Sequence, residues 1–299
     1  MRPANLALLA DRGIVRVAGA DAKKLLQGLI TNDMDLLATQ PAIHAALLSP
    51  QGKILFEFFV VRSGEAYLLE TAVAQAAPLS KRLMLYKLRA KVEISDQCAN
   101  HAVFALWGAP AAALEAMPDS TAFVDPRLAQ MGTRIIAQNA AGAAVAAMPG
   151  TQPAAAADWH RHRIGLSVPE ADRDYRLGDT FLHEANYDQL SGVSFGKGCF
   201  IGQEVASRMQ HRGGGRKRII AVEGTAALAA NAALTAGPTP LGSLGSVDGS
   251  RALALVRLDR AAEALAAGIA ITADGVPVRL VKPAWAHFAM APTPRTEAV

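Results

Sequence analysis

Residues 43–71, IHAALLSPQGKILFEFFVVRSGEAYLLET, constrain the fold more than any other part of the chain. They contain three apolar segments separated by SPQG and RSGE, which are typical turn sequences. Short turns of this kind join antiparallel strands, because a parallel pair needs a crossover of about a dozen residues or more. The stretch therefore predicts three antiparallel strands and argues against the regular strand–helix alternation of a doubly wound sheet.

The segments around these strands add helices, and the end of the chain changes character. Residues 13–19, GIVRVAG, alternate like a strand, and Asp21 can cap a following helix whose leucines share one face. Residues 72–87 are a further predicted helix. After a triple glycine, short apolar segments and glycine-rich turns are typical of a small barrel or sandwich. The sequence predicts an α+β region at 1–213 and a C-terminal β-barrel domain at 214–299.

The composition excludes two broad classes of protein. Only two cysteines are present, so the chain lacks the disulfide framework of small secreted proteins. No apolar run is long enough to span a bilayer, and residues 1–13 make a poor signal peptide. The net charge of +4 and the pI near 9.2 suit an anionic ligand as well as nucleic acid. We therefore expect a cytoplasmic protein that does not bind a membrane.

Residues 195–218, FGKGCFIGQEVASRMQHRGGGRKR, are compatible with three chemistries: a dinucleotide-binding turn, a reactive or metal-ligating thiol, and a nucleic-acid patch. The glycines Gly196, Gly198 and Gly202 are spaced one residue wider than the dinucleotide fingerprint. The Ser or Thr that a phosphate-binding P-loop needs is also missing. The basic residues lack interleaved aromatic rings, which single-stranded nucleic-acid platforms use for stacking. An anionic small molecule or an acidic partner protein fits this cluster better.

Cys199 carries the remaining chemistry of this stretch. A lone cysteine is most often a small buried residue. Here, however, Lys197 and several arginines favour the thiolate, and Gly198 leaves the adjacent backbone uncovered. Iron–sulfur clusters need several thiolates, so a cluster at Cys199 requires ligands from a partner. Metal ligation by His160 and His162 is disfavoured, because residues two apart diverge on a helix.

The octapeptide KGCFIGQE, residues 197–204, resembles the K-G-C-Y/F-x-G-Q-E signature of the YgfZ family of folate-binding, iron–sulfur cluster assembly proteins. Similarity to this family also appears at residues 19–34, 46–60 and 181–213 and at RKRI, residues 216–219, so its segments are spread over most of the chain. The family is related to the glycine-cleavage T-protein, an aminomethyltransferase. The resemblance implies a T-protein-like folate-binding fold of interleaved α+β subdomains, followed by a C-terminal β-barrel.

The resemblance also implies a function. It indicates a tetrahydrofolate-binding accessory protein for the assembly or repair of iron–sulfur clusters in client enzymes, including tRNA-modifying ones. The implied partners are iron–sulfur carrier proteins, client enzymes and reduced folate, without direct contact to nucleic acid. The alternative is a folate-dependent aminomethyltransferase or demethylase. This enzymatic role is less expected, because the catalytic aspartate of the T-protein has no counterpart that the sequence places.

The family pattern gives the residues of the motif their expected roles. Lys197 and Cys199 match its functional pair, and Cys199 is expected either to ligate a transient cluster shared with a partner or to act as a redox-active thiol. Arg12 stands where some members have a tryptophan, and Phe200 replaces the commoner tyrosine. The expected folate contacts are Trp159, Lys197, Gly198, Phe200, Gln203, Glu204 and Arg212.

Overall fold

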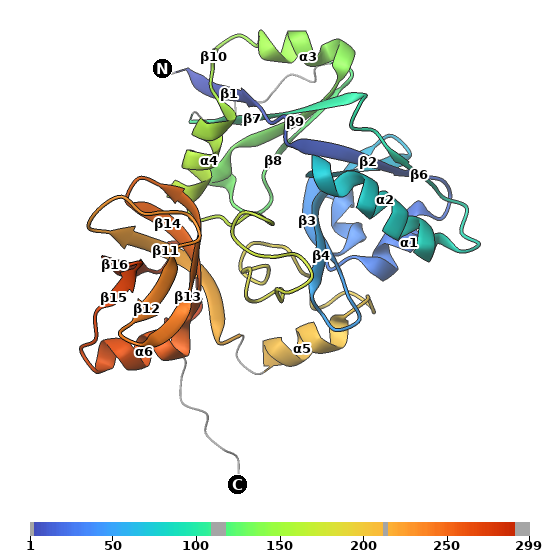
Figure 1. Ribbon diagram of the computed structural model, residues 1–299. Helices are drawn as coiled ribbons and strands as arrows, with labels where there is room; N and C mark the ends of the chain where they lie inside the picture. Colours follow the sequence, from blue (N-terminus) through green and yellow to red (C-terminus); the bar gives the residue numbers. More distant parts are fainter. Residues whose placement is uncertain (1–2, 109–117, 212–214, 291–299) are drawn as a thin grey trace. The chain divides into compact units, whose positions relative to one another are not determined.

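The computed structural model describes residues 3–108, 118–211 and 215–290 of the chain (Figure 1). It contains two sheets with helices and a closed β-barrel, which confirms the predicted α+β class with a C-terminal barrel. Within these ranges, no helix is both long and apolar enough to cross a bilayer.

The contacts of the chain divide it into two compact units. Unit 1 comprises Met1–His162 and Leu190–Gln203, and unit 2 comprises Arg163–Gln189 and Glu204–Val299. The chain therefore leaves unit 1 after His162 and contributes a late segment to it from Leu190 onward. The domain boundary expected at 213/214 stays a prediction. The division by contacts describes compact units rather than sequence domains, and its unit 2 also includes Arg163–Gln189.

The first sheet of unit 1 has the strand order β3-β4-β5-β2-β6. All its neighbouring strands are antiparallel, and register pairs such as Ala45 with Phe58 and Val61 with Leu68 join its hairpins. This arrangement confirms the three antiparallel strands that the turn sequences predict. The strands are β2 (Arg12–Ala18), β3 (Ala42–Leu48), β4 (Ile54–Ser63), β5 (Ala66–Ala72) and β6 (Glu93–Asp96).

Helices α1 (Ala22–Leu29) and α2 (Val73–Lys87) share a hydrophobic core with this sheet. Leu26 of α1 and Leu79 of α2 are completely buried in it, as the helical spacing of the apolar residues predicts. Asp21 stands at the N-cap of α1, but its carboxylate accepts a hydrogen bond from the Lys91 amide (2.8 Å) and none from α1. A short 3-10 helix, η1 (Met34–Ala38), follows α1.

The second sheet of unit 1 has the strand order β10-β1-β7-β9-β8. Its core is formed by residues such as Leu6, Phe104 and Ile135, which lie on neighbouring strands. The strands are β1 (Ala4–Leu8), β7 (His101–Trp107), β8 (Ser120–Val124), β9 (Thr133–Gln138) and β10 (Thr151–Pro153). The nearby helices are η2 (Ala129–Met131), α3 (Asn139–Ala146) and α4 (Ala156–Gly165).

A buried network of ion pairs connects these two sheets. Arg134 of β9 donates hydrogen bonds to Glu70 of β5 (2.7 Å) and to Asp125 (3.3 Å). Arg12 of β2 also donates to Glu70 (2.8 Å), and Arg127 pairs with Asp125 (2.8 Å). Burial raises the pKa of Asp125, but the charges and hydrogen bonds of the two neighbouring arginines outweigh it and hold that pKa well below its usual range. Arg12, which stands where some members of the resembled family have a tryptophan, thus pairs with a buried carboxylate.

Glu57 extends this network on β4. Its Oε1 lies 3.3 Å from Nε2 of His44 and 3.8 Å from Nη1 of Arg127. Burial raises the pKa of Glu57, but the hydrogen bond and charge of His44, with the charges of Arg127 and Arg12, lower it to about 2. All these groups are buried, so each charge depends on its partners.

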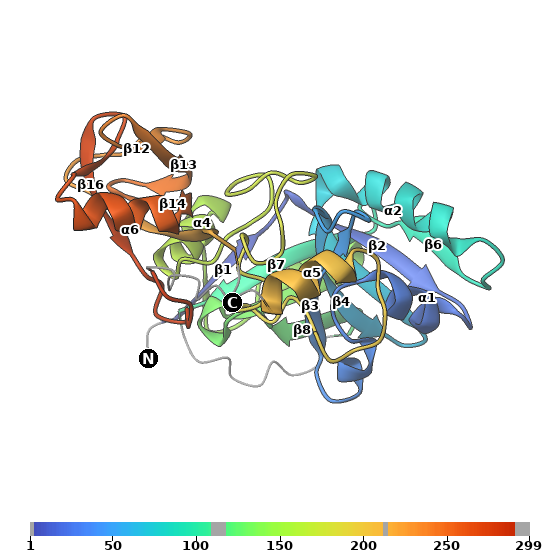
Figure 2. The ribbon, with the colours of Figure 1, turned by 90° about the horizontal axis from the view of Figure 1, so that it is seen from below.

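Unit 2 contains the closed barrel, with the strand order β11-β14-β13-β12-β15-β16. Helix α6 (Leu258–Ala266) packs against the barrel and contributes to its core (Figures 1 and 2). The strands are β11 (Lys217–Gly224), β12 (Ala233–Ala236), β13 (Thr239–Asp248), β14 (Arg251–Arg257), β15 (Ile271–Ala273) and β16 (Val276–Val281). Helix α5 (Gln203–His211) precedes the barrel in the chain.

Candidate functional site

Lys197 anchors the loop before α5 to the end of α1. Its Nζ donates hydrogen bonds to the carbonyl oxygens of Gln27 (2.7 Å), Ile30 (2.8 Å) and Asn32 (2.8 Å). A helix leaves its last carbonyls without partners inside the helix and carries partial negative charge there, so an ammonium group stabilises that end. Burial lowers the pKa of Lys197 to about 8, opposed by the Asp33 carboxylate. The three donors of the ammonium are matched by three acceptors, which gives this side chain an anchoring position.

Two further contacts fix the same loop. The Phe200 ring is buried and lies 5.3 Å from Nζ of Lys197, close enough for a cation–π contact. Gly202 has φ +78, and a Cβ at this position would lie 2.6 Å from the carbonyl oxygen of Ser49 in the β3–β4 turn. Only glycine combines that backbone conformation with so close an approach. The loop is therefore held on both sides of residues 198–199.

Cys199 lies between these anchors and is exposed. Gly198 beside it is also exposed, and a Cβ there would meet no atom within 4 Å. The thiol is consequently accessible to a large partner as well as to a small electrophile. The expected role of Cys199 as the chemically active group of the motif requires this exposure and stays a prediction.

The other thiol, Cys98, is not grouped with Cys199 as a second metal ligand in the described residues. Cys98 is partly buried near the carbonyl of Ile14, and burial raises its pKa to about 11. In the part of the chain that the structure describes, no three His, Cys, Asp or Glu side chains are grouped to hold a metal ion. A cluster at Cys199 would therefore need its remaining ligands from another molecule.

Trp159 is a core residue rather than an open stacking surface. Its side chain is 1% exposed, and its ring contacts Trp107 (5.5 Å between centroids) and His162 (5.8 Å). The guanidinium of Arg134 lies 5.3 Å from the same ring. A ligand cannot stack on a side chain covered in this way. The expected folate contact at Trp159 does not fit this structure, because the sequence does not show whether an aromatic ring faces a ligand or the core.

The remaining expected folate contacts fall into different surroundings. Gln203 begins α5, and its Oε1 accepts a hydrogen bond from the Phe200 amide (3.4 Å). Glu204 is exposed and pairs with Arg208 (2.6 Å) on the same helix. Arg212 lies outside the described residues. The hydrogen bonds of Lys197 and the burial of Trp159 leave neither side chain open to a folate, and the assignment of the other expected contacts stays a prediction.

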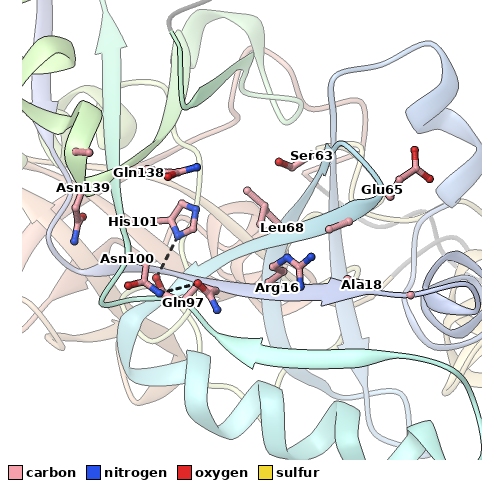
Figure 3. A pocket seen from close by; sticks show the side chains of 13 residues that line it. Arg16, Ala18, Ser63, Glu65, Leu68, Gln97, Asn100, His101, Gln138 and Asn139 are labelled. Carbon is pink, nitrogen blue, oxygen red and sulfur yellow. Dashed lines mark hydrogen bonds between the residues drawn. The ribbon is translucent and has the colours of Figure 1, made fainter.

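A pocket of about 700 Å³ lies elsewhere in unit 1. Figure 3 shows that polar side chains surround it, among them Arg16, His101 and Gln138. None of the residues expected to act in function lines this pocket. We place the candidate site at Cys199 instead, because the exposed thiol gives that loop a reactive group, whereas the pocket is distinguished only by its volume.

Comparisons with known proteins agree with this fold. The family model "GCVT N-terminal domain" matches residues 9–146, and the model "CAF17, C-terminal beta-barrel domain" matches residues 216–288. The crystal structure of glycine cleavage system aminomethyltransferase T from Bartonella henselae superposes with a TM-score of 0.77 and 15% identity, covering 96% of this chain and 87% of that one. The chain has an aminomethyltransferase fold. At this identity, the aminomethyltransferase fold says nothing about activity.

Curated proteins similar to this chain include iron–sulfur cluster assembly factors that bear the name IBA57. The human and the mouse proteins are both 34% identical to this chain, over 72% of its length and 65% of their own. The homolog of Mycosarcoma maydis is 32% identical over 72% of this chain and 56% of its own length. The chain thus spans less than two thirds of these relatives. Their names describe them as mitochondrial, so the expectation of a cytoplasmic protein is contradicted.

Proposed function

We propose that this protein is an assembly factor for iron–sulfur clusters and that Cys199 is its cluster ligand. The observation that carries the proposal is the exposed thiol on a loop held by Lys197, Phe200 and Gly202. The similarity to proteins named as iron–sulfur cluster assembly factors supports it over 72% of the chain. A finer proposal, which the KGCFIGQE motif supports, is a YgfZ-like role whose clients include tRNA-modifying enzymes.

In this proposal the cluster is cargo. Cys199 supplies one thiolate, and a carrier protein supplies the other ligands, so the cluster is held only between the two proteins. Transfer to a client exchanges thiolate ligands without any change in oxidation state. The anchored loop keeps the thiol in one position before the carrier arrives, which reduces the entropy lost on binding.

The proposal predicts a selective defect in cells that lack this protein. Iron–sulfur enzymes should lose most of their activity, while enzymes without clusters should keep theirs, because only cluster delivery is interrupted. The measurement compares both classes of enzyme in extracts of deletion and complemented cells. Equal activities of the iron–sulfur enzymes in both extracts would contradict the proposal.

We also propose that the protein binds tetrahydrofolate, on the support of the aminomethyltransferase fold and the motif alone. Two of the residues assigned to this ligand, Trp159 and Lys197, are covered or fully hydrogen-bonded, so no step of cluster assembly is routed through folate. Calorimetric titration with tetrahydrofolate should detect one site, and Trp159→Phe should leave its affinity unchanged, since the ring is covered. A titration without heat at millimolar ligand would overturn this proposal and leave the role of Cys199 standing.

A further inference from the structure

We infer that the ends of α1 and α2 in unit 1 form a docking surface for an acidic, amphipathic helix of a partner protein. We call it the basic–apolar surface. It comprises the apolar residues Leu25, Gly28, Leu29, Met84, Leu85, Tyr86, Leu88 and Ala90, with the basic residues Lys24, Lys81, Arg82, Lys87, Arg89 and Lys91. The inference does not depend on the proposed function.

The apolar part of this surface is unusually exposed. Leu88 is 87% exposed, Leu85 69% and Met84 49%, and all three lie at the end of α2. Single exposed apolar residues are ordinary on a protein surface, but a contiguous group marks an interaction site. Three large apolar side chains within one helical turn and a half form such a group.

Leu88, the most exposed of these side chains, has a strained backbone conformation. Leu88 has φ 46 and ψ −110, outside the conformations that residues with a Cβ readily adopt. Such a residue costs about 1–3 kcal/mol and persists where the surrounding structure imposes it, often at a binding site. The leucine gains no burial in return, since it is the most exposed of the large apolar residues described. A partner that covers Leu88 would give it the burial that unit 1 does not.

A cavity beside Leu88 can receive a side chain. It has a volume of about 420 Å³, and its lining includes Leu25, Gly28 and Leu29 of α1 together with Tyr86 and Leu88. Gly28 lies inside α1, where glycine costs about 0.5–1 kcal/mol relative to alanine. A Cβ at this position would meet no atom within 4 Å, so packing inside unit 1 does not require glycine. The missing side chain instead leaves the cavity open.

The charge around this cavity selects an acidic occupant. Lys24, Lys87 and Arg89 line it, and its one acidic lining residue, Asp21, already accepts a hydrogen bond from the Lys91 amide. Lys81 lies one helical turn before Leu85, which brings a further positive charge to the same face of α2. Complementary charge steers a partner to such a surface. A concave site beside protruding leucines fits a helix with spaced apolar side chains and acidic flanks better than it fits a flat membrane.

Photocrosslinking from this surface tests the inference in the full-length chain. Leu88 is replaced by p-benzoylphenylalanine in cells, and the crosslinked segment is identified by mass spectrometry. The segment should be acidic, with apolar residues at helical spacing. The double variant Lys87→Glu/Arg89→Glu should reduce its yield by about fivefold or more, because charge complementarity is lost. Gly28→Leu, which fills the cavity, should also reduce it.

Matched controls separate docking from general stickiness. The same photocrosslinker at Leu265, which is 58% exposed on α6, should not capture that segment. The double variant Lys217→Glu/Lys282→Glu, at exposed basic positions of unit 2, should leave the yield from position 88 unchanged. Thermal unfolding should show that all variants fold. A lipid adduct, a basic segment, a yield insensitive to charge reversal, or no adduct would each overturn the inference, and none of them bears on cluster assembly.

Discussion

Cys199→Ala should reduce the activity of client iron–sulfur enzymes in cells by at least about tenfold, since loss of a direct ligand exceeds the 10–100-fold effects seen for outer-shell partners. The alanine removes the only exposed thiol of the described residues and leaves the anchors of the loop in place. The measurement is the activity of iron–sulfur enzymes in deletion cells that express the variant. Its thermal midpoint should equal that of the original protein, because the side chain is exposed.

Cys98→Ala is the matched control for this result. Cys98 is partly buried on the side of the sheet near Ile14, and its high pKa keeps the thiol protonated. This variant should retain client activity. The comparison also tests the alternative function, since a folate-dependent transferase needs a base and folate rather than a thiol. Full client activity with Cys199→Ala would reject Cys199 as the cluster ligand.

Asp125→Asn should lower the free energy of unfolding by about 3–5 kcal/mol, the cost of breaking a buried ion pair from one side. In the variant, Arg127 and Arg134 stay buried but lose the negative charge of the Asp125 carboxylate. One amide hydrogen of the new asparagine would also point toward a guanidinium. Urea denaturation measures the change. A loss below about 1 kcal/mol would show that the network is less dependent on each partner than its burial indicates.

Glu65→Gln provides a surface control, because its pair with Arg62 is exposed and should contribute little to the free energy of unfolding.

Acid unfolding gives an independent readout of the same network. The pKa of Glu57 is lowered in the folded state to about 2 from an ordinary value of 4.5. Its contribution to stability is therefore complete above pH 4.5 and is lost as the pH falls toward 2. Glu57→Gln should flatten the pH dependence in that window.

The turn sequences and the apolar spacing predicted the antiparallel strands β3, β4 and β5, the helices α1 and α2 and the C-terminal barrel, because these features depend on neighbouring residues. The loop with Cys199 was also predicted, from the motif. The anchoring of Lys197 was not, because its acceptors lie 165–170 residues earlier in the chain. The buried network escaped prediction for the same reason, since its arginines and carboxylates come from separate strands. Only the protruding Leu85 and Leu88 gave a local signal for the basic–apolar surface, as apolar residues beyond the buried stripe of α2.

The discontinuous make-up of unit 1 has a consequence for synthesis of the protein on the ribosome. The segment Leu190–Gln203 completes this unit and binds to the end of α1, which is made much earlier. The carbonyls of Gln27, Ile30 and Asn32 therefore lack the ammonium donor of Lys197 until a further half or more of the chain has been translated. A nascent or prematurely ended chain that stops between residues 98 and 199 carries Cys98 but cannot present Cys199. Because translation runs from the N-terminus, the accessible thiol is made after all of unit 1 except residues 200–203.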